Sequence, residues 1–389
     1  MKKALLFLFI LLCSTSINAQ TIYEHFESRK LNATRELKIR LPTDYDPDSK
    51  LKYPVILVFD GDYLFEPVVG QIAFQTYFDK MPEAIVVAVV QGRERFYDSY
   101  HDEVTGLPIE FGARFYEFIS TELIPYIDRK YKTSKFKVAV GHDLMANFMN
   151  SFLLKDDPLF KAYVNLSPDF KGKMDENIAN RLKWLNEDIF YYMATSEDDI
   201  VPLRNGILDA NQKLRQIDNK ALKYYFDDFE GDSHYTLVTG ALSKALDKIF
   251  ELYKPISDRE FKEDILTYEG TLDTYISKRY KKIEDLFGIH KLISEDEFEK
   301  IIRAAEQRDD LASLERIGKL ANKQDPTTSY GTYYMALHAE RIGKTKRAKK
   351  LYESALDLES TTHINKDLIL LNLEGLTVAT DDQESDIDD

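Results

Sequence analysis

The sequence predicts an α/β protein with a doubly wound, mostly parallel sheet, followed by a smaller all-helical domain. From Leu37 to about Tyr253, short apolar runs alternate with helical patterns. One of these runs, Ile85–Val90, is apolar on both faces, as a parallel strand covered by helices on both sides requires. After Pro255 such runs stop, and charged sequence with helical spacing takes over.

Each apolar run is short enough to be a single strand of the predicted sheet. The predicted strands are Leu37–Leu41, Val55–Phe59, Ile85–Val90, Val138–Val140, Ala162–Leu166, Ile189–Ala194 and Leu222–Phe226.

Residues 1–19 are typical of a secretory signal peptide. Two lysines precede the apolar run Ala4–Leu12, and a polar segment ends at Ala19. This run is too short to span a bilayer, so we expect an exported protein, periplasmic or extracellular, with no integral membrane span after signal removal. The single cysteine, Cys13, lies in this segment. The mature chain is therefore expected to contain no disulfide and no cysteine metal site.

The rest of the chain is long enough for two domains. We assign residues 20–254 to the α/β domain, 255–378 to the helical domain, and 379–389 to an acidic tail that is expected to be disordered. The formal net charge of the full sequence is −15. Because nucleic acids and anionic membrane surfaces repel such a protein, we expect neither as a partner.

The helical domain contains one helix–turn–helix of tetratricopeptide type. Its helices cover 333–342 and 345–358, and small residues such as Ala336 and Ala348 allow them to pack closely. A second unit 34 residues earlier is weak, because Leu314 stands where Ala348 would repeat. A single unit leaves an apolar face uncovered. This favours helices docked on the first domain over a separate module that binds a protein partner, although both remain possible roles.

Residues 138–147 are the most informative stretch of the chain. They predict a buried strand, a sharp turn at Asp143, and then a helix. Such an elbow exposes one side chain above the sheet and aims the next backbone N–H at a developing oxyanion. In the G-x-S-x-G motif this side chain is a serine, and here it is an aspartate.

Three ordered segments carry a resemblance to a known family. Tyr53–Asp62, Phe115–Ile127 and Gly141–Asp143 together resemble the putative esterase family of α/β-hydrolases, which includes enterochelin esterases, S-formylglutathione hydrolases and carbohydrate esterases. The resemblance covers about Leu37 to Tyr253 and implies that fold and esterase-type hydrolysis. The family pattern at the elbow is G-H-S-x-G-G, whereas this chain has G-H-D-L-M-A.

Chain order in this fold places the acid and the histidine after the elbow. His234 follows the last predicted strand and matches the family's histidine, although it is also placed to cap the following helix. For the acid, Asp198 fits the family's Asp-x-x-Val-Pro spacing better than its neighbour Asp199 does. We therefore predict that Asp143, His234 and Asp198 form the catalytic set, with Asp199 as the alternative acid.

The oxyanion hole requires two backbone donors, and the expected ones are the N–H groups of Leu144 and of Gly61 or Asp62. Side chains near the mouth suggest substrate contacts. The residues proposed for substrate binding are His142, Arg95 and Tyr63. Arg95 also has a simpler interpretation as part of a surface salt-bridge cluster. No cofactor and no metal is predicted, since phosphate-loop and metal-ligand spacings are missing from the sequence.

Two substitutions at the elbow leave the function open. Without a serine the acyl-enzyme route lacks its nucleophile, and Met145 replaces a small residue where helix and strand approach closely, so it could widen the elbow. Haloalkane dehalogenases and soluble epoxide hydrolases use an aspartate nucleophile on this fold. Asp143 is therefore a nucleophile, a base that activates water, or inert. The leading interpretation is an exported hydrolase of a small ester, with an inactive pseudo-esterase that binds a ligand or protein, and an assembly module, as alternatives.

Overall fold

The computed structural model describes residues 21–385, so the predicted signal peptide lies outside the described residues. The chain forms two compact units. The first comprises residues up to Lys254 together with Leu286–Ile289, and the second comprises Pro255–Asp285 and the residues from His290 onward. The short segment Leu286–Ile289 thus belongs to the first unit, although the sequence places it in the helical domain.

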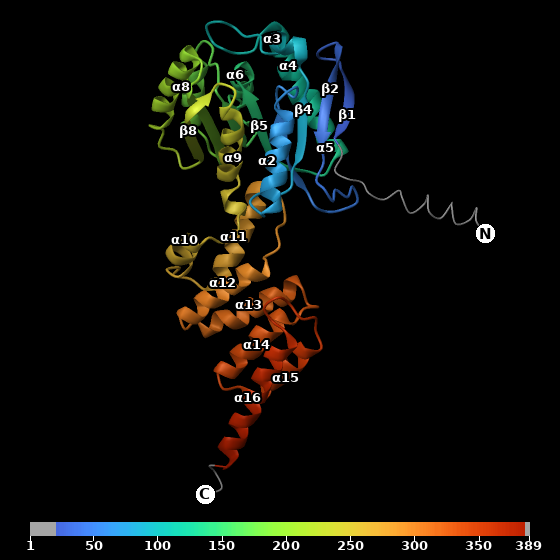
Figure 1. Cartoon of the computed structure of the whole chain (residues 1–389), viewed down its shortest axis with the longest axis vertical. Helices are drawn as coiled ribbons and strands as arrows, with labels where there is room; N and C mark the ends of the chain where they lie inside the picture. Colours follow the sequence, from blue (N-terminus) through green and yellow to red (C-terminus); the bar gives the residue numbers. More distant parts are fainter. Residues whose placement is uncertain (1–20, 386–389) are drawn as a thin grey trace, which may run out of the picture. The chain divides into compact units, whose positions relative to one another are not determined.

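The first unit contains an eight-stranded sheet in the order β1-β2-β4-β3-β5-β6-β7-β8 (Figure 1). Strands β3 to β8 run parallel, while β1 and β2 pair antiparallel at one edge. This sheet confirms the predicted fold class. The strands are β1 (Ile22–Ser28), β2 (Ala33–Arg40), β3 (Tyr53–Val58), β4 (Ile85–Val89), β5 (Thr133–His142), β6 (Ala162–Leu166), β7 (Ile189–Asp198) and β8 (Leu222–Ser233).

Strand β1 is the one the sequence missed. Its side chains alternate between half-buried and exposed, because it is an edge strand with one face in solvent, so no apolar run marks it. Strands β5, β7 and β8 also extend beyond the predicted runs. The extra residues of β7 and β8, apart from Phe229, are polar or glycine and lie at the carboxyl ends of these strands, where functional side chains come together.

Helices cover both faces of the sheet, as a parallel sheet requires. Helices α2 (Phe65–Tyr77) and α9 (Leu237–Ile249) lie together on one face and are seen in front of the strands in Figure 1. The other face is covered by a second group of helical segments, which are α4 (Glu110–Glu117), η2 (Phe118–Leu123), α5 (Ile124–Lys130), α6 (Leu144–Met149), α7 (Met174–Leu182) and α8 (Val201–Leu214).

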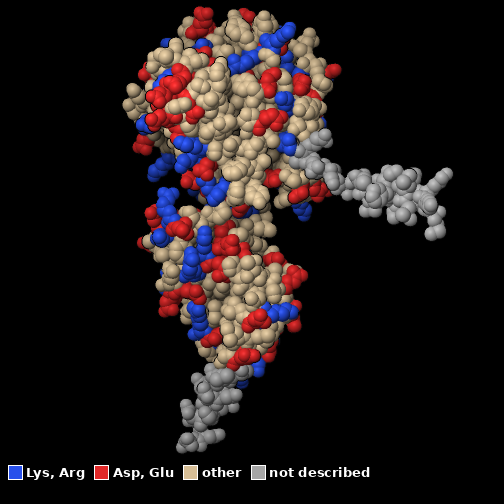
Figure 2. All heavy atoms as spheres, in the orientation of Figure 1, with Lys and Arg blue, Asp and Glu red and all other residues tan. Residues whose placement is uncertain are grey.

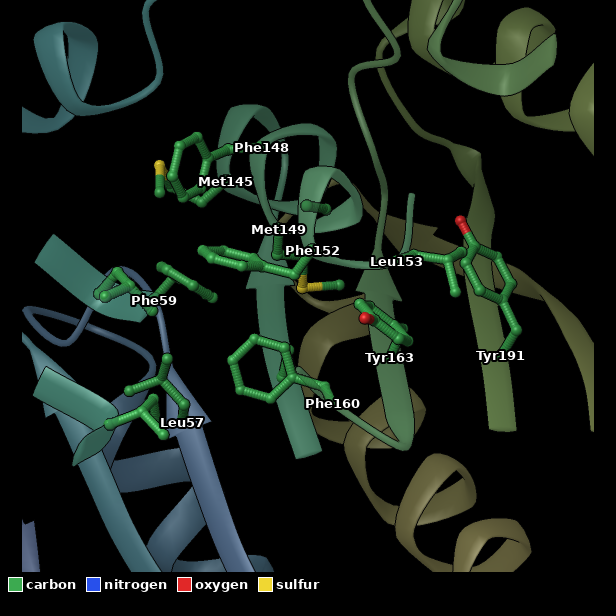
Figure 3. Packing of buried hydrophobic residues seen from close by; sticks show 14 of the residues in the cluster. Leu57, Phe59, Met145, Phe148, Met149, Phe152, Leu153, Phe160, Tyr163 and Tyr191 are labelled. Atoms are coloured by element: carbon green, nitrogen blue, oxygen red, sulfur yellow. The ribbon is translucent and has the colours of Figure 1, made fainter. Parts of the chain in front are cut away.

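An aromatic core lies between the sheet and this second group of helices (Figure 3). Phe59 at the end of β3 packs edge-on against Phe148 of α6, with ring centroids 5.7 Å apart. Phe152 stacks on Tyr116 of α4, with ring centroids 4.4 Å apart. These buried rings fix the height of α6 above the sheet and therefore the position of the elbow that precedes it.

The second unit is built from helices alone. The apolar sides of these helices form one buried cluster. The predicted pair appears as α14 and α15, but packing continues on both sides, from α12 through α16. The helical segments are α10 (Asp258–Glu260), η5 (Phe261–Ile265), α11 (Leu272–Phe287), α12 (Glu295–Gln307), α13 (Leu311–Gln324), α14 (Ser329–Arg341), α15 (Thr345–Leu356) and α16 (Lys366–Ser385).

Helix α13 takes the place of the helix in the weak second repeat. Gly318 stands 34 residues before Tyr352, where the repeat would have an aromatic residue. A Cβ at Gly318 would lie 2.7 Å from the carbonyl oxygen of Gly331 on α14, so the two helices meet backbone to backbone. Helix α16 runs into the segment predicted to be a disordered tail, and residues 386–389 lie outside the described part. No helix in residues 21–385 is long and apolar enough to cross a membrane.

Candidate active site

The strand-to-helix elbow forms at Asp143, between β5 and α6. Asp143 has φ 55° and ψ −123°, a left-handed conformation that costs energy for any residue with a side chain. Its N–H donates to Leu166 and its carbonyl accepts from Asp169. A Cβ at Gly141 would lie 2.9 Å from the backbone of Met145 and Ala146, so only glycine permits this close approach. The elbow predicted from the sequence is therefore present.

The side chain of Met145 points into the aromatic core rather than between helix and strand. It is fully buried beside Phe148 (Figure 3), and its sulfur lies 3.4 Å from the amide nitrogen of Gln91. The backbone of α6 still contacts Gly141. The expectation that Met145 widens the elbow is therefore wrong, because the core has room for the longer side chain.

His234 is paired with a buried carboxylate. Its Nδ1 donates to Oδ1 of Asp199 over 2.8 Å, and the hydroxyls of Ser167 and Thr195 donate to the other oxygen, Oδ2, over 2.7 and 2.8 Å. Burial disfavours the charge of Asp199, but the hydrogen bonds from His234, Ser167, Thr195 and the backbone of Ile200 outweigh burial and lower its pKa to about 2. Asp199 is therefore ionised at neutral pH and fixes the tautomer of His234, with the proton on Nδ1.

The preference for Asp198 as the acid is wrong. Asp198 is still part of β7, where its Cα pairs with Ser233 after a register shift, and its side chain is exposed. Asp199 comes one residue later, where the strand has ended and the side chain turns inward. Spacing in the sequence did not reveal this shift, because the shift arises from the pairing of β7 with β8.

Asp143 contacts an arginine rather than the histidine. Its Oδ2 lies 3.3 Å from Nη1 of Arg95, and within residues 21–385 no hydrogen bond joins it to His234. Arg95 is held more tightly by Asp60, with Nε 2.6 Å from Oδ1 and Nη2 3.1 Å from Oδ2. Burial works against the charge of Arg95, but the hydrogen bonds and charge of Asp60 raise its pKa. Arg95 is thus a fixed cation between two carboxylates.

His142 connects the two halves of the site. It is buried, its Nε2 donates to the backbone oxygen of His234 over 3.1 Å, and its Nδ1 lies 2.9 Å from the hydroxyl of Tyr63. Burial, with the nearby ring of His234, lowers the pKa of His142 to about 4, so this ring is neutral at pH 7. The structure does not support substrate binding by His142, because both ring nitrogens are occupied. Tyr63 also bonds Asp60, over 3.0 Å, while its ring remains 46% exposed.

Two backbone donors remain available for an oxyanion. The N–H of Gly61 donates to the carbonyl of Val89 over 2.9 Å, so Gly61 is excluded as a donor. Leu144 is the first residue of α6, where an N–H has no partner within the helix. Within the described chain the N–H groups of Asp62 and Leu144 donate to no loop or strand acceptor. Both N–H groups can therefore donate hydrogen bonds to a developing oxyanion.

Sequence reasoning missed two residues of the site. Asp60 was not among the predicted site residues, but it is buried and carries the main contacts to Arg95. Ser167 was not considered, although it directly follows the apolar run of β6, at the carboxyl edge of the sheet where sites form. In the described residues, no group of three or more His, Cys, Asp or Glu side chains is arranged to hold a metal ion.

Comparisons with known proteins identify similar sequences and folds. Residues 28–168 match the family described as "Putative esterase". No curated protein matches the sequence. A crystal structure of an uncharacterised protein from Capnocytophaga ochracea is similar along both units, with a TM-score of 0.84, 29% identity, and 92% of this chain and 100% of that chain covered.

Two further structures are similar over smaller parts of the chain. One is an IroE-like serine hydrolase from Shewanella oneidensis, with a TM-score of 0.57, 22% identity, and 77% of this chain and 98% of that chain covered. The other is the BES protein from Bacillus cereus, with a TM-score of 0.53, 25% identity, and 61% and 97% covered. The segment 28–168 of the α/β unit is therefore similar to the putative esterase family of α/β-hydrolases.

Proposed function

We propose that the chain is a hydrolase of a small ester, in which water takes the place of the serine nucleophile. The observation that carries this proposal is the 2.8 Å bond between Asp199 and His234. It places the proton of His234 on Nδ1 and leaves Nε2 with a lone pair. Within the described residues Nε2 makes no hydrogen bond and is not enclosed, so it is available as a base.

The proposed reaction has two proton transfers. The oxygen of a water molecule attacks the carbonyl carbon of the ester while Nε2 of His234 accepts a proton from that water. The carbonyl electron pair moves to its oxygen, which the N–H groups of Asp62 and Leu144 stabilise. The tetrahedral intermediate then collapses, the bond to the alkoxy oxygen breaks, and His234 returns its proton to that oxygen. The products are a carboxylic acid and an alcohol.

Asp143 is assigned the role of holding the attacking water. One of its carboxylate oxygens contacts Arg95, and the other has no partner in residues 21–385 and can accept a hydrogen bond. A water between Asp143 and His234 would also account for the missing direct bond between them. Direct attack by Asp143 on the ester would give a reactive anhydride, so we favour water as the nucleophile.

A hydrolysis assay with p-nitrophenyl acetate tests this function. We expect slow turnover by the purified chain, a loss to the uncatalysed rate in His234→Ala, and a decrease of about 100-fold or more in Asp199→Asn. Asp198→Asn is the matched control and should keep the original rate. Turnover that persists in His234→Ala would show that the reaction does not depend on this histidine and would reject the proposal.

A pseudo-esterase that only binds a ligand is the second candidate. The contact between Arg95 and Asp143 favours it, because an ion pair makes a carboxylate less able to accept a proton or attack carbon. This candidate predicts no turnover on p-nitrophenyl esters, alkyl halides or epoxides, together with a ligand-dependent rise in melting temperature.

Export is a separate proposal, supported by residues 1–19. It predicts that the mass of the protein recovered from the native host is that of a chain starting near Gln20.

A further inference from the structure

Negative charge exceeds positive charge at the site. Asp60 uses both carboxylate oxygens on Arg95, at 2.6 and 3.1 Å, so these two residues form a nearly neutral pair. Asp143 reaches the same guanidinium through a single 3.3 Å contact and is 24% exposed at its side chain. With His142 neutral and Asp199 ionised beside His234, the single positive charge of Arg95 faces two carboxylates, Asp60 and Asp143, so these three residues together carry a net negative charge.

The two segments that carry the acid and the histidine add more negative charge. Residues 196–203 and 227–236 contain no lysine and no arginine. Asp227 and Asp228 are paired with Lys244 and Arg204. Within residues 21–385, four other acidic residues of these segments have no ion pair, and they are Glu197, Asp198, Glu230 and Asp232. Figure 2 shows acidic side chains gathered over α8 and the end of β8. Such a rim attracts cations toward the site.

Aromatic rings lie beside the paired histidines. The ring of Tyr235 is 73% exposed and contacts the rings of His234 and His142, with centroids 4.9 and 6.2 Å away. The centroid of the Tyr63 ring lies 5.9 Å from that of His142, and Tyr63 is 46% exposed. Both rings can bind an organic cation through their faces, as ammonium groups commonly bind between aromatic side chains.

We propose that this site takes a substrate that carries an ammonium group, held near the carboxylate of Asp143 and the rings of Tyr63 and Tyr235. That the substrate is an ester rests on the proposed function, whereas the preference for a cation does not. A positive charge on the substrate would also lower the electrostatic cost of forming the oxyanion in that reaction. An oxyanion forming beside Asp143 is repelled by it, and a neighbouring positive charge reduces this repulsion.

A matched pair of esters tests the preference for a cation. Acetylcholine carries a trimethylammonium group, and 3,3-dimethylbutyl acetate has the same shape without the charge. Binding of each to the full chain would be measured by calorimetry or ligand-observed NMR at low salt. We expect the cation to bind about tenfold more tightly. This preference should shrink at about 0.5 M salt, because added ions screen exposed charges.

Charge-removing variants distinguish the site from the general acidity of the protein. Asp143→Asn and, on the rim, Glu230→Gln should each weaken acetylcholine binding several-fold, and Glu230→Gln should leave binding of 3,3-dimethylbutyl acetate unchanged. Glu27→Gln is the control, because it removes the same charge from exposed β1, at the opposite edge of the sheet from β8. Thermal melting confirms that each variant is folded.

The outcomes separate the two proposals. Equal binding of both esters, or a preference that neither Asp143→Asn nor Glu230→Gln changes, overturns the cation proposal even if esters are hydrolysed. Selective binding of acetylcholine without any turnover supports the cation site and rejects the hydrolase.

Discussion

Three aspartates at the site share one functional group and differ in their surroundings. Asp60 is buried against Arg95, Asp199 is buried against His234, and Asp143 stands partly exposed on the elbow. Burial alone raises the pKa of a carboxyl group, and hydrogen bonds from donors lower it. The local donors therefore decide which aspartate supports the fold, which orients the histidine, and which faces a ligand.

Asp199 should make the stability of the first unit depend on pH. Its pKa falls from 3.8 in the unfolded chain to about 2 in the folded one, because four donors favour the ionised form. A lowered pKa contributes stability that is present above about pH 4 and is lost as the pH falls through about 2. We expect Asp199→Asn to cost on the order of 2 kcal/mol at pH 7 and little at pH 2. Urea unfolding at several pH values measures this. A cost independent of pH would contradict the assignment.

The elbow should accept a serine nucleophile. Asp143→Ser places a hydroxyl on the strained residue, near the free N–H groups of Asp62 and Leu144. We expect this variant to react with a fluorophosphonate, giving a covalent mass increase on the introduced serine that His234→Ala prevents. Because Met145 packs in the core, adding Met145→Gly should not be required. If only the double variant is labelled, Met145 does disturb the elbow, contrary to the observed packing.

At the scale of secondary-structure elements, two glycines allow neighbouring elements to pack backbone to backbone. At Gly141 a helix meets a strand, and at Gly318 a helix meets a helix, each where a Cβ would lie less than 3.0 Å from backbone atoms. The first contact sets the elbow, and the second allows α13 and α14 to pack. In both places a missing side chain permits the packing of two elements.

Two glycine-to-alanine changes separate contact from helix propensity. Gly318→Ala should destabilise the helical unit by about 1–3 kcal/mol, because the new methyl group must push α14 away. Gly375→Ala on α16 should leave stability unchanged or raise it by up to about 1 kcal/mol, since a Cβ there meets nothing within 4 Å. Denaturant unfolding of the full chain compares the two variants. A stabilising Gly318→Ala would contradict the close contact.

At the scale of the whole molecule, the first unit is not one continuous stretch of chain. It includes the segment Leu286–Ile289, which follows the first helices of the second unit in the sequence. Phe287, the last residue of α11, is fully buried in the first unit. Its ring lies 4.9 Å from that of Phe136 and 5.3 Å from that of Phe250. In the helical unit, the side chains of Leu337, Leu351 and Leu356 pack on that unit's own core.

Phe287→Ala should therefore destabilise the first unit. Removing this ring leaves a cavity beside Phe136 and Phe250, with a cost of about 3–5 kcal/mol. Phe74→Ala is the control, because Phe74 is 62% exposed and its loss should cost little. A chain truncated after Pro255 should melt at a lower temperature for the same reason. Unchanged melting of both the Phe287→Ala protein and the truncated chain would show that the segment is not part of the first unit.

The sequence alone determined the parallel sheet, the elbow at Asp143 and the loop that carries His234. Buried strands and sharp turns are local patterns, and chain order places their ends at one edge of the sheet. Only the tertiary structure decided that Asp199 is the acid, that Gly61 donates to Val89, and that Arg95 lies between Asp60 and Asp143. These features depend on strand register and on side chains from separate loops. Such contacts form only when the chain has folded.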